Sequence, residues 1–189
     1  MTSGAGRASA PGQKQGREPV THPEQGPEPG PERPIRVLFI CTGNSARSQM
    51  AEALLRRLGG PAFEAFSAGT EPKGVHPLTV RALGAAGIDA SLARSKSVTE
   101  FLEQSFDYVV TVCDQARESC PVFTGARVSL HWGFEDPAAA TGTEEERLAV
   151  FERVLGEIAE RVRAFVPDAL RERELTDRRV GWPAGRLTG

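Results

Sequence analysis

Apolar and polar positions alternate between two rhythms from residue 35 onward, and each rhythm predicts a different element. Short runs of consecutive apolar residues predict strands covered on both faces, whereas apolar residues three or four apart predict helices packed by one face. The expected strands are 35–41, 63–67, 108–112 and 128–131, and the expected helices are 48–58, 77–86, 98–102 and 143–166. Strands that alternate with helices predict an α/β fold with an open parallel sheet.

The last of these helices has the clearest signals at its ends. Thr143 and Glu146 form a capping box at its start, and Pro167 is expected to stop it. Its apolar stripe consists of Leu148, Phe151, Leu155, Ile158, Val162 and Phe165. The acidic residues 144–146 are therefore explained by the helix dipole rather than by metal binding. The helix 77–86 likewise has a stop signal in Gly87.

The chain divides into three parts by composition. Residues 1–34 contain seven of the 14 prolines and hardly any large apolar side chain, so we expect a disordered Pro/Gly-rich extension. Residues 35–167 are expected to form the catalytic domain. Residues 168–189 are expected to form a C-terminal tail that carries at most one short helix.

Composition also excludes several classes of partner. A net charge of −2 and a pI near 6.0 argue against nucleic acid or an anionic membrane as the main partner. No apolar run reaches the ~20 residues of a membrane span, and the N-terminus lacks an apolar signal region, so we expect a cytoplasmic protein. Three cysteines in a reducing compartment indicate reactivity rather than a disulfide framework. We expect a monomer.

The first expected strand leads directly into a cysteine, a short loop and an arginine. Cys41 ends the strand, Arg47 begins the next helix, and small or polar residues lie between them: Thr42, Gly43, Asn44, Ser45 and Ala46. Backbone N–H groups of such a loop can converge on a tetrahedral oxyanion, which the helix N-terminus and the forked guanidinium also attract. The same positive field stabilises a nucleophilic thiolate on Cys41. The simpler interpretation is a buried cysteine at a strand end.

Two further cysteines lie close together in the sequence. In a sheet of order 2-1-3-4 with helices on both faces, ligands bind at the carboxyl ends of strands 1 and 3, so Cys113 is expected in the same crevice as Cys41. Cys120 follows Cys113 by seven residues. If that stretch is helical, the two residues are ~10.5 Å apart along the axis, whereas a disulfide tolerates a Cα separation of only about 4.4–6.8 Å. A bridge would require the segment to unwind; two unrelated small cysteines are the alternative.

A third motif, residues 131–137, follows the last expected strand at the same edge of the sheet. Its carboxylic acid, Asp136, can reach over the loop and protonate a departing oxygen. An ordinary Asp-Pro turn or helix cap is the alternative. His131 and Trp132 are interpreted as packing residues, and the scattered histidines show no zinc-ligand spacing.

These three motifs, in this order, resemble those of the thioredoxin-coupled arsenate reductases, which share the low-molecular-weight phosphotyrosine phosphatase fold. The resemblance extends over residues 35–166 and is carried by residues 41–52, 109–121 and 131–137. It implies an enzyme that converts arsenate to arsenite without a cofactor. Cys41 would attack arsenate, Arg47 and the loop would hold the adduct, and Asp136 would serve as general acid.

The resemblance also implies the later steps and the partner. Cys113 would attack Cys41 and release arsenite, and Cys120 would then attack Cys113. Unwinding of the segment between them would expose a Cys113–Cys120 disulfide, and thioredoxin would reduce it as the electron donor.

Some relatives bind potassium beside the loop through an Asn, a Glu, a Ser and an Asp. Asn44, Glu52 and Ser67 match the first three, but Lys96 stands at the position of the Asp. A lysine does not ligate a cation, although its ammonium can occupy the same space, so no metal site is expected.

Two other functions use the same residues. A tyrosine phosphatase would use the loop and Asp136 equally well, but phosphatases of this family usually have a tyrosine after the Asp-Pro, where residues 138–140 are alanines. A phosphatase also has no use for Cys113 and Cys120. A non-enzymatic oxyanion- or redox-sensing module would bind anions without turnover.

Overall fold

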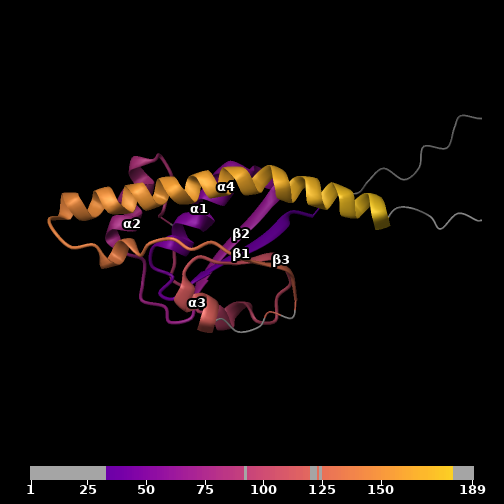
Figure 1. Cartoon of the computed structure of the whole chain (residues 1–189), viewed down its shortest axis with the longest axis horizontal. Helices are drawn as coiled ribbons and strands as arrows, with labels where there is room; N and C mark the ends of the chain where they lie inside the picture. Colours follow the sequence, from indigo (N-terminus) through magenta and orange to yellow (C-terminus); the bar gives the residue numbers. More distant parts are fainter. Residues whose placement is uncertain (1–32, 92, 120–122, 124, 181–189) are drawn as a thin grey trace, which may run out of the picture. The chain divides into compact units, whose positions relative to one another are not determined.

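A four-stranded parallel sheet forms the centre of the protein (Figure 1). The structure is a computed structural model that describes residues 33–91, 93–119, 123 and 125–180. Its strands are β1 (Ile35–Cys41), β2 (Phe63–Gly69), β3 (Phe106–Thr111) and β4 (Ala126–His131). They lie in the order β2-β1-β3-β4, and each neighbouring pair is parallel. The fold class and the strand order expected from the sequence are confirmed.

Helices cover both faces of this sheet, also as predicted. The α-helices are α1 (Arg47–Gly59), α2 (Pro77–Ala85), α3 (Asp114–Ser119) and α4 (Glu144–Val180), and single 3₁₀ turns occur at Gly60–Ala62, Val98–Phe101 and Pro137–Ala139. α1 and α2 pack against α4, and Figure 1 shows α3 on the opposite side of the sheet from α4.

The core is built around the two central strands. Every residue of β3 is buried and β1 is buried at all positions except Arg36, whereas alternate residues of the edge strand β4 are exposed. An aromatic cluster of Phe39, Trp132 and Phe165 attaches α4 to the sheet, with successive ring centroids 5.6 and 5.5 Å apart. The near-continuous apolar runs of β1 and β3 are therefore explained by their central positions.

The start of α4 agrees with the prediction, but its end does not. Thr143 N donates to the Glu146 carboxylate at 2.8 Å and Glu146 N donates to the Thr143 hydroxyl at 3.2 Å, which confirms the capping box. The prediction that Pro167 ends the helix is wrong, because α4 continues through it to Val180. Residues 168–180, expected to be tail, are thus helical.

Tertiary contacts explain why the helix tolerates the proline. Pro167 removes one backbone hydrogen bond, but residues beyond it are bound to the sheet. The Tyr108 hydroxyl donates to Glu172 at 2.7 Å, and Arg127 donates to the Thr176 hydroxyl at 2.9 Å. Burial, and then the hydrogen bond to Glu172, raise the pKa of Tyr108.

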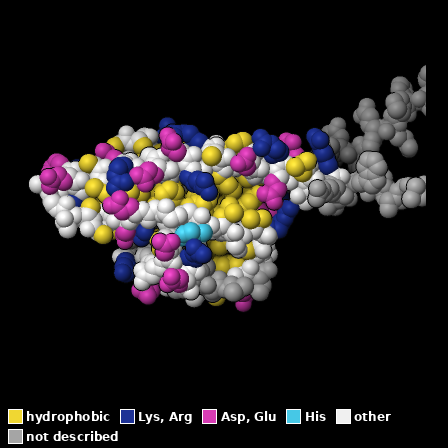
Figure 2. Space-filling model, viewed as in Figure 1, with side chains coloured by type: hydrophobic (Ala, Val, Ile, Leu, Met, Phe, Trp, Pro, Cys, Tyr) yellow, Lys and Arg dark blue, Asp and Glu magenta, His cyan; other side chains and the backbone are white. Residues whose placement is uncertain are grey.

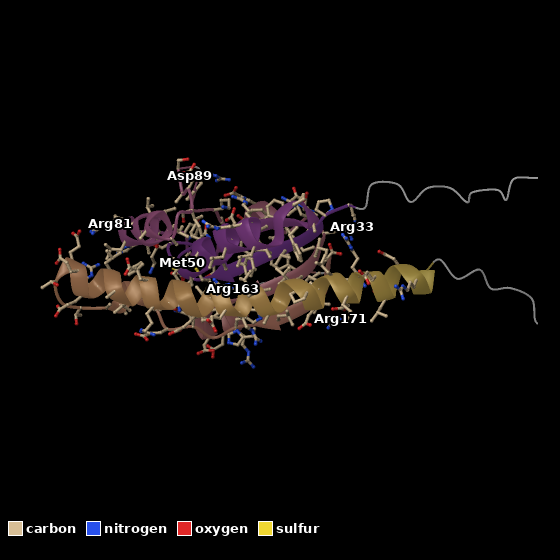
Figure 3. All side chains as sticks on the ribbon, turned by 90° about the horizontal axis from the view of Figure 1, so that it is seen from above. Arg33, Met50, Arg81, Asp89, Arg163 and Arg171 are labelled. Carbon is tan, nitrogen blue, oxygen red and sulfur yellow. The ribbon has the colours of Figure 1, made fainter. Side chains whose placement is uncertain are left out.

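The two ends of the described chain meet beside this extension. Arg173 donates to the Arg33 carbonyl at 3.1 Å, and Figure 3 shows Arg33 and Arg171 at the same end of the molecule. Figure 2 shows charged side chains of both signs along the exposed side of α4, as its amphipathic pattern requires. Within the part of the chain that the structure describes, no helix is long and apolar enough to cross a membrane.

Asp107 provides a pH-dependent contact at the same end. Burial acts to raise the pKa of this carboxyl, but hydrogen bonds from Arg33 at 2.7 Å and from Arg36 N at 2.9 Å, with the charges of Arg33 and Arg127, outweigh burial and lower it. A carboxyl whose pKa is lower in the folded state stabilises the protein above its unfolded pKa of about 3.9, and this contribution is lost as pH falls through the folded pKa.

We therefore expect Asp107→Asn to reduce the free energy of unfolding by about 1.5–3 kcal/mol at pH 7, the range for a hydrogen-bonded charge. The difference from wild type should shrink as pH falls below 4. Urea unfolding of both proteins between pH 3 and pH 7 measures this. Asp168→Asn is the matched control, because among the described residues Asp168 forms an ion pair with its exposed helical neighbour Arg171 alone. A difference that stays constant with pH would contradict the assignment.

Candidate active site

The loop between β1 and α1 is held open by hydrogen bonds to its outer side. Each carbonyl from Cys41 to Ala46 accepts a bond from a residue beyond the loop: Thr70 N to Cys41 at 3.2 Å, Glu71 N to Thr42 at 2.8 Å, Lys73 N to Gly43 at 2.9 Å, Gln49 Nε2 to Asn44 at 3.1 Å, His76 N to Ser45 at 3.0 Å and Met50 N to Ala46 at 2.9 Å. Because C=O and the following N–H point in opposite directions across a trans peptide plane, the loop N–H groups are turned inward. Inward N–H groups of this kind are what an anion-binding concavity requires.

Two residues allow this tight path. Asn44 adopts the left-handed conformation, with φ of 43°, which asparagine tolerates better than most residues. Gly69 lies at the end of β2 against the loop, where a Cβ would come within 2.7 Å of the Thr42 carbonyl oxygen. Glycine is therefore required at position 69 because the loop backbone passes so close.

Cys41 lies at the base of the loop, as expected, and is almost fully buried. Its sulfur is 3.0 Å from the Ser48 hydroxyl, on the first turn of α1. That hydroxyl can donate to a thiolate and stabilise the negative charge. Sequence reasoning did not identify Ser48, although a hydroxyl directly after the loop arginine, on the turn facing the strand end, was the available signal.

Arg47 and Asp136, predicted to meet over the loop, are brought together. Arg47 Nη2 is 3.2 Å from the Asp136 carboxylate, and Nη1 donates to the Phe134 carbonyl at 3.1 Å. Asp136 also accepts a hydrogen bond from Ala138 N at 3.2 Å. Asp136 thus caps the 3₁₀ turn that follows it, as the alternative interpretation required. Its carboxylate also lies beside the loop arginine.

Cys113 is a second free, buried thiol at the same edge of the sheet. Its sulfur is 3.6 Å from the hydroxyl of Thr42, the loop residue next to Cys41, and the same hydroxyl donates to Gln115 at 3.3 Å. α3 begins directly after Cys113, so the residues that follow Cys113 are helical. This is the case in which a bridge between Cys113 and Cys120 would require the segment to unwind. Cys120 lies outside the described residues.

A buried polar network lies beneath the loop. Asn44 Nδ2 donates to Ser48 at 2.8 Å and to Ser67 at 2.9 Å, and Ser67 donates to Glu52. Lys96 Nζ is 3.2 Å from the Glu52 carboxylate, and Lys96 N donates to Asn44 Oδ1 at 2.7 Å. The network therefore connects a buried ion pair to the Ser48 hydroxyl beside Cys41.

The same ion pair bears on the potassium site of some relatives. Because the Lys96 ammonium already lies against Glu52, the residues present do not fit a bound monovalent cation there. Among the described residues, no group of three or more His, Cys, Asp or Glu side chains is arranged to hold a metal ion.

His76, to which the sequence assigned no role, supports the loop from outside. Its backbone N–H binds the Ser45 carbonyl, and its ring caps α2 by accepting from Leu78 N at 3.1 Å. Burial, and then the charge of Arg147, lower the pKa of His76, which favours the neutral ring that can accept this bond. Its role here is structural.

The chain is similar to known proteins in sequence and in fold. The family model for low molecular weight phosphotyrosine protein phosphatases matches residues 36–176. The arsenate reductase of Halalkalibacterium halodurans is 45% identical over 129 residues, which cover 68% of this chain and 93% of that protein. A solved arsenate reductase in the phosphate binding state has a TM-score of 0.62 at 30% identity, covering 71% of this chain and 98% of that one. The thioredoxin-dependent arsenate reductase of Corynebacterium glutamicum has a TM-score of 0.58 at 31% identity, covering 74% and 64%.

The network predicts that removing the Lys96 ammonium lowers the free energy of unfolding. The side chains of Lys96 and Glu52 are only 12% and 7% exposed. Among the described residues, Lys96→Met therefore leaves the Glu52 carboxylate with Arg56 as its one cationic partner. We expect the free energy of unfolding to fall by about 2 kcal/mol, less than the ~3–5 kcal/mol of a pair broken completely. Phosphate affinity should fall as well, because the network holds Asn44.

Urea unfolding and phosphate titration measure the two effects. Arg56→Met is the matched control, since Arg56 is 57% exposed and its loss should cost less. Adding Glu52→Gln to Lys96→Met should restore part of the stability, because the uncompensated charge is then removed. A Lys96→Met variant as stable as wild type would contradict this interpretation.

Proposed function

The chain belongs to the low molecular weight phosphotyrosine protein phosphatase family, and we propose that within it this protein is an enzyme that reduces arsenate to arsenite. One observation carries the proposal. A second buried free thiol, Cys113, lies against the loop that begins at the first thiol, with Thr42 Oγ1 3.6 Å from its sulfur. Hydrolysis of a phosphoester needs one nucleophile, whereas reduction of an oxyanion needs two thiols to supply two electrons.

The first step is nucleophilic attack on the bound oxyanion. The inward N–H groups of the loop, the start of α1 and Arg47 hold arsenate, and the Cys41 thiolate attacks arsenic. An As–S bond forms and an As–O bond breaks. Asp136, placed at Arg47, protonates the departing oxygen, which leaves as water.

The second step transfers the electrons. The Cys113 thiolate attacks the Cys41 sulfur, an S–S bond forms, and the electron pair of the S–As bond remains on arsenic. Arsenic is thereby reduced from the +5 to the +3 state and leaves as arsenite, while two thiolates become one disulfide. The short separation between the Cys113 sulfur and the Thr42 hydroxyl supports this step, because Thr42 is the residue next to Cys41.

The third step regenerates the nucleophile. We propose that Cys120 attacks Cys113, that Cys41 leaves as thiolate, and that thioredoxin reduces the resulting Cys113–Cys120 disulfide. This requires α3 to unwind, since a helix keeps its ends too far apart for a disulfide. The cytoplasm is the compartment in which such thiols stay reduced. One chain carries all three cysteines, so a monomer suffices.

The decisive experiment measures NADPH consumption with arsenate, thioredoxin and thioredoxin reductase present. We expect turnover with the wild type and none with Cys41→Ser, because no other group begins the reaction. Phosphate in place of arsenate is the control, and it should bind without consuming NADPH.

Two other outcomes would replace the proposal. Hydrolysis of an aryl phosphate without NADPH consumption would indicate a phosphatase, which the loop and Asp136 would also serve. Oxyanion binding without either reaction would indicate a sensing module.

The relay makes a separate prediction for Cys120→Ser. The first turnover needs only Cys41 and Cys113, so the variant should release about one equivalent of arsenite per protein. Multiple turnover with thioredoxin should then fall at least about tenfold, because the Cys41–Cys113 disulfide is buried and exchange depends on access. Quenched arsenite assays under single- and multiple-turnover conditions measure both. Normal cycling of Cys120→Ser would show that Cys120 has no part in the reaction.

A further inference from the structure

The side chain of His131, at the end of β4, binds residues on both sides of Cys113. Nδ1 is 2.9 Å from the Thr111 hydroxyl and Nε2 is 3.0 Å from the Asp114 carboxylate. Thr111 is the last residue of β3 and Asp114 is the first residue of α3. A single imidazole therefore connects the strand that precedes the second thiol to the helix that follows it.

The hydrogen-bonding capacity of these groups fits this arrangement. A carboxylate only accepts, so the Asp114 oxygen requires the proton on Nε2. In the neutral ring Nδ1 then accepts, and the Thr111 hydroxyl can donate to it. The imidazole is thus oriented by Asp114 and in turn holds Thr111, and both of its ring nitrogens are used.

α3 depends on such contacts because it is short. A six-residue helix is not stable by itself. Its described contacts with the rest of the protein lie in its first half: Asp114 binds His131, Gln115 binds Thr42, and Ala116 is fully buried. The pair of Asp114 with His131 is therefore one of few contacts that fix where the helix begins, and with it the position of Cys113.

We propose that His131 is a positioning residue for the second thiol. It holds Cys113 against the loop in the reduced protein, and its bond to Asp114 breaks when α3 unwinds. His131 contacts no reacting atom, so it acts through Thr111 and Asp114. The role in turnover rests on the proposed relay, but the contact itself can be tested without arsenate.

The first experiment measures amide exchange across residues 114–118 in the reduced protein. His131→Phe keeps the ring volume and removes both hydrogen bonds, and we expect exchange there to accelerate about fivefold, as for one lost net hydrogen bond. Asp114→Ala should accelerate exchange as well. In the double variant the effects should not add, because either change alone breaks the same contact.

Two results from the exchange experiment would overturn the proposal. Glu118→Ala is the matched control, since Glu118 is an exposed carboxylate on the same helix. Equal acceleration by Glu118→Ala would show that the effect is not specific to the contact with His131. Full additivity of His131→Phe and Asp114→Ala would show that Asp114 acts only through the helix dipole. Neither result depends on arsenate, so failure here is distinct from failure of the proposed function.

The second experiment tests positioning in the Cys120→Ser background. His131→Phe should slow single-turnover arsenite release about fivefold while leaving phosphate affinity unchanged, since only the approach of Cys113 is affected. His131→Gln should recover part of the rate, because its amide both donates and accepts. An unchanged release rate, or an equal loss of phosphate affinity, would overturn the role in positioning.

Discussion

The site depends on one constraint: the loop carbonyls must be bound from outside so that the N–H groups face inward. Backbone polar groups that are buried without partners are costly, so the loop keeps this path only because neighbouring segments supply the donors. Lys73 and His76 donate from the chain after β2, and Gln49 donates from α1. The loop geometry is therefore a product of the fold, because the chain after β2 and the first turn of α1 must both lie against the loop.

Parallel topology explains why the second thiol is available. β1 and β3 are neighbours in the centre of the sheet, and their carboxyl ends carry Cys41 and Cys113. A ligand crevice at this edge is a general property of such sheets. The chain adds a second thiol to this crevice, and that addition distinguishes oxyanion reduction from phosphoester hydrolysis on the same fold.

The buried charges beneath the loop likewise depend on partners from other parts of the fold. An isolated buried carboxylate is unstable, and Glu52 is compensated by Lys96 and Arg56 from two different segments. The Lys96 ammonium thereby compensates the buried negative charge of Glu52 next to the loop. At the opposite end of the sheet, Tyr108 and Arg127 bind the extension of α4 and make a proline acceptable within a helix.

The sequence by itself determined most of the elements and the positions of Cys41, Arg47, Cys113 and Asp136 at their ends, because periodicity and loop chemistry are local signals. The strand order 2-1-3-4 was an expectation for the fold class, since the pairing of strands is not a local signal, and the structure confirms it. The pair of Lys96 with Glu52 and the contacts of His131 join segments far apart in the chain, so only the tertiary structure decided them. Ser48 is seven residues from Cys41, and its contact with the sulfur depends on how α1 lies against the end of β1. The end of α4 was decided in the same way. A proline locally predicts a stop, but α4 continues beyond it, where Ala169 is buried and Glu172 and Thr176 accept hydrogen bonds from Tyr108 and Arg127 of the sheet.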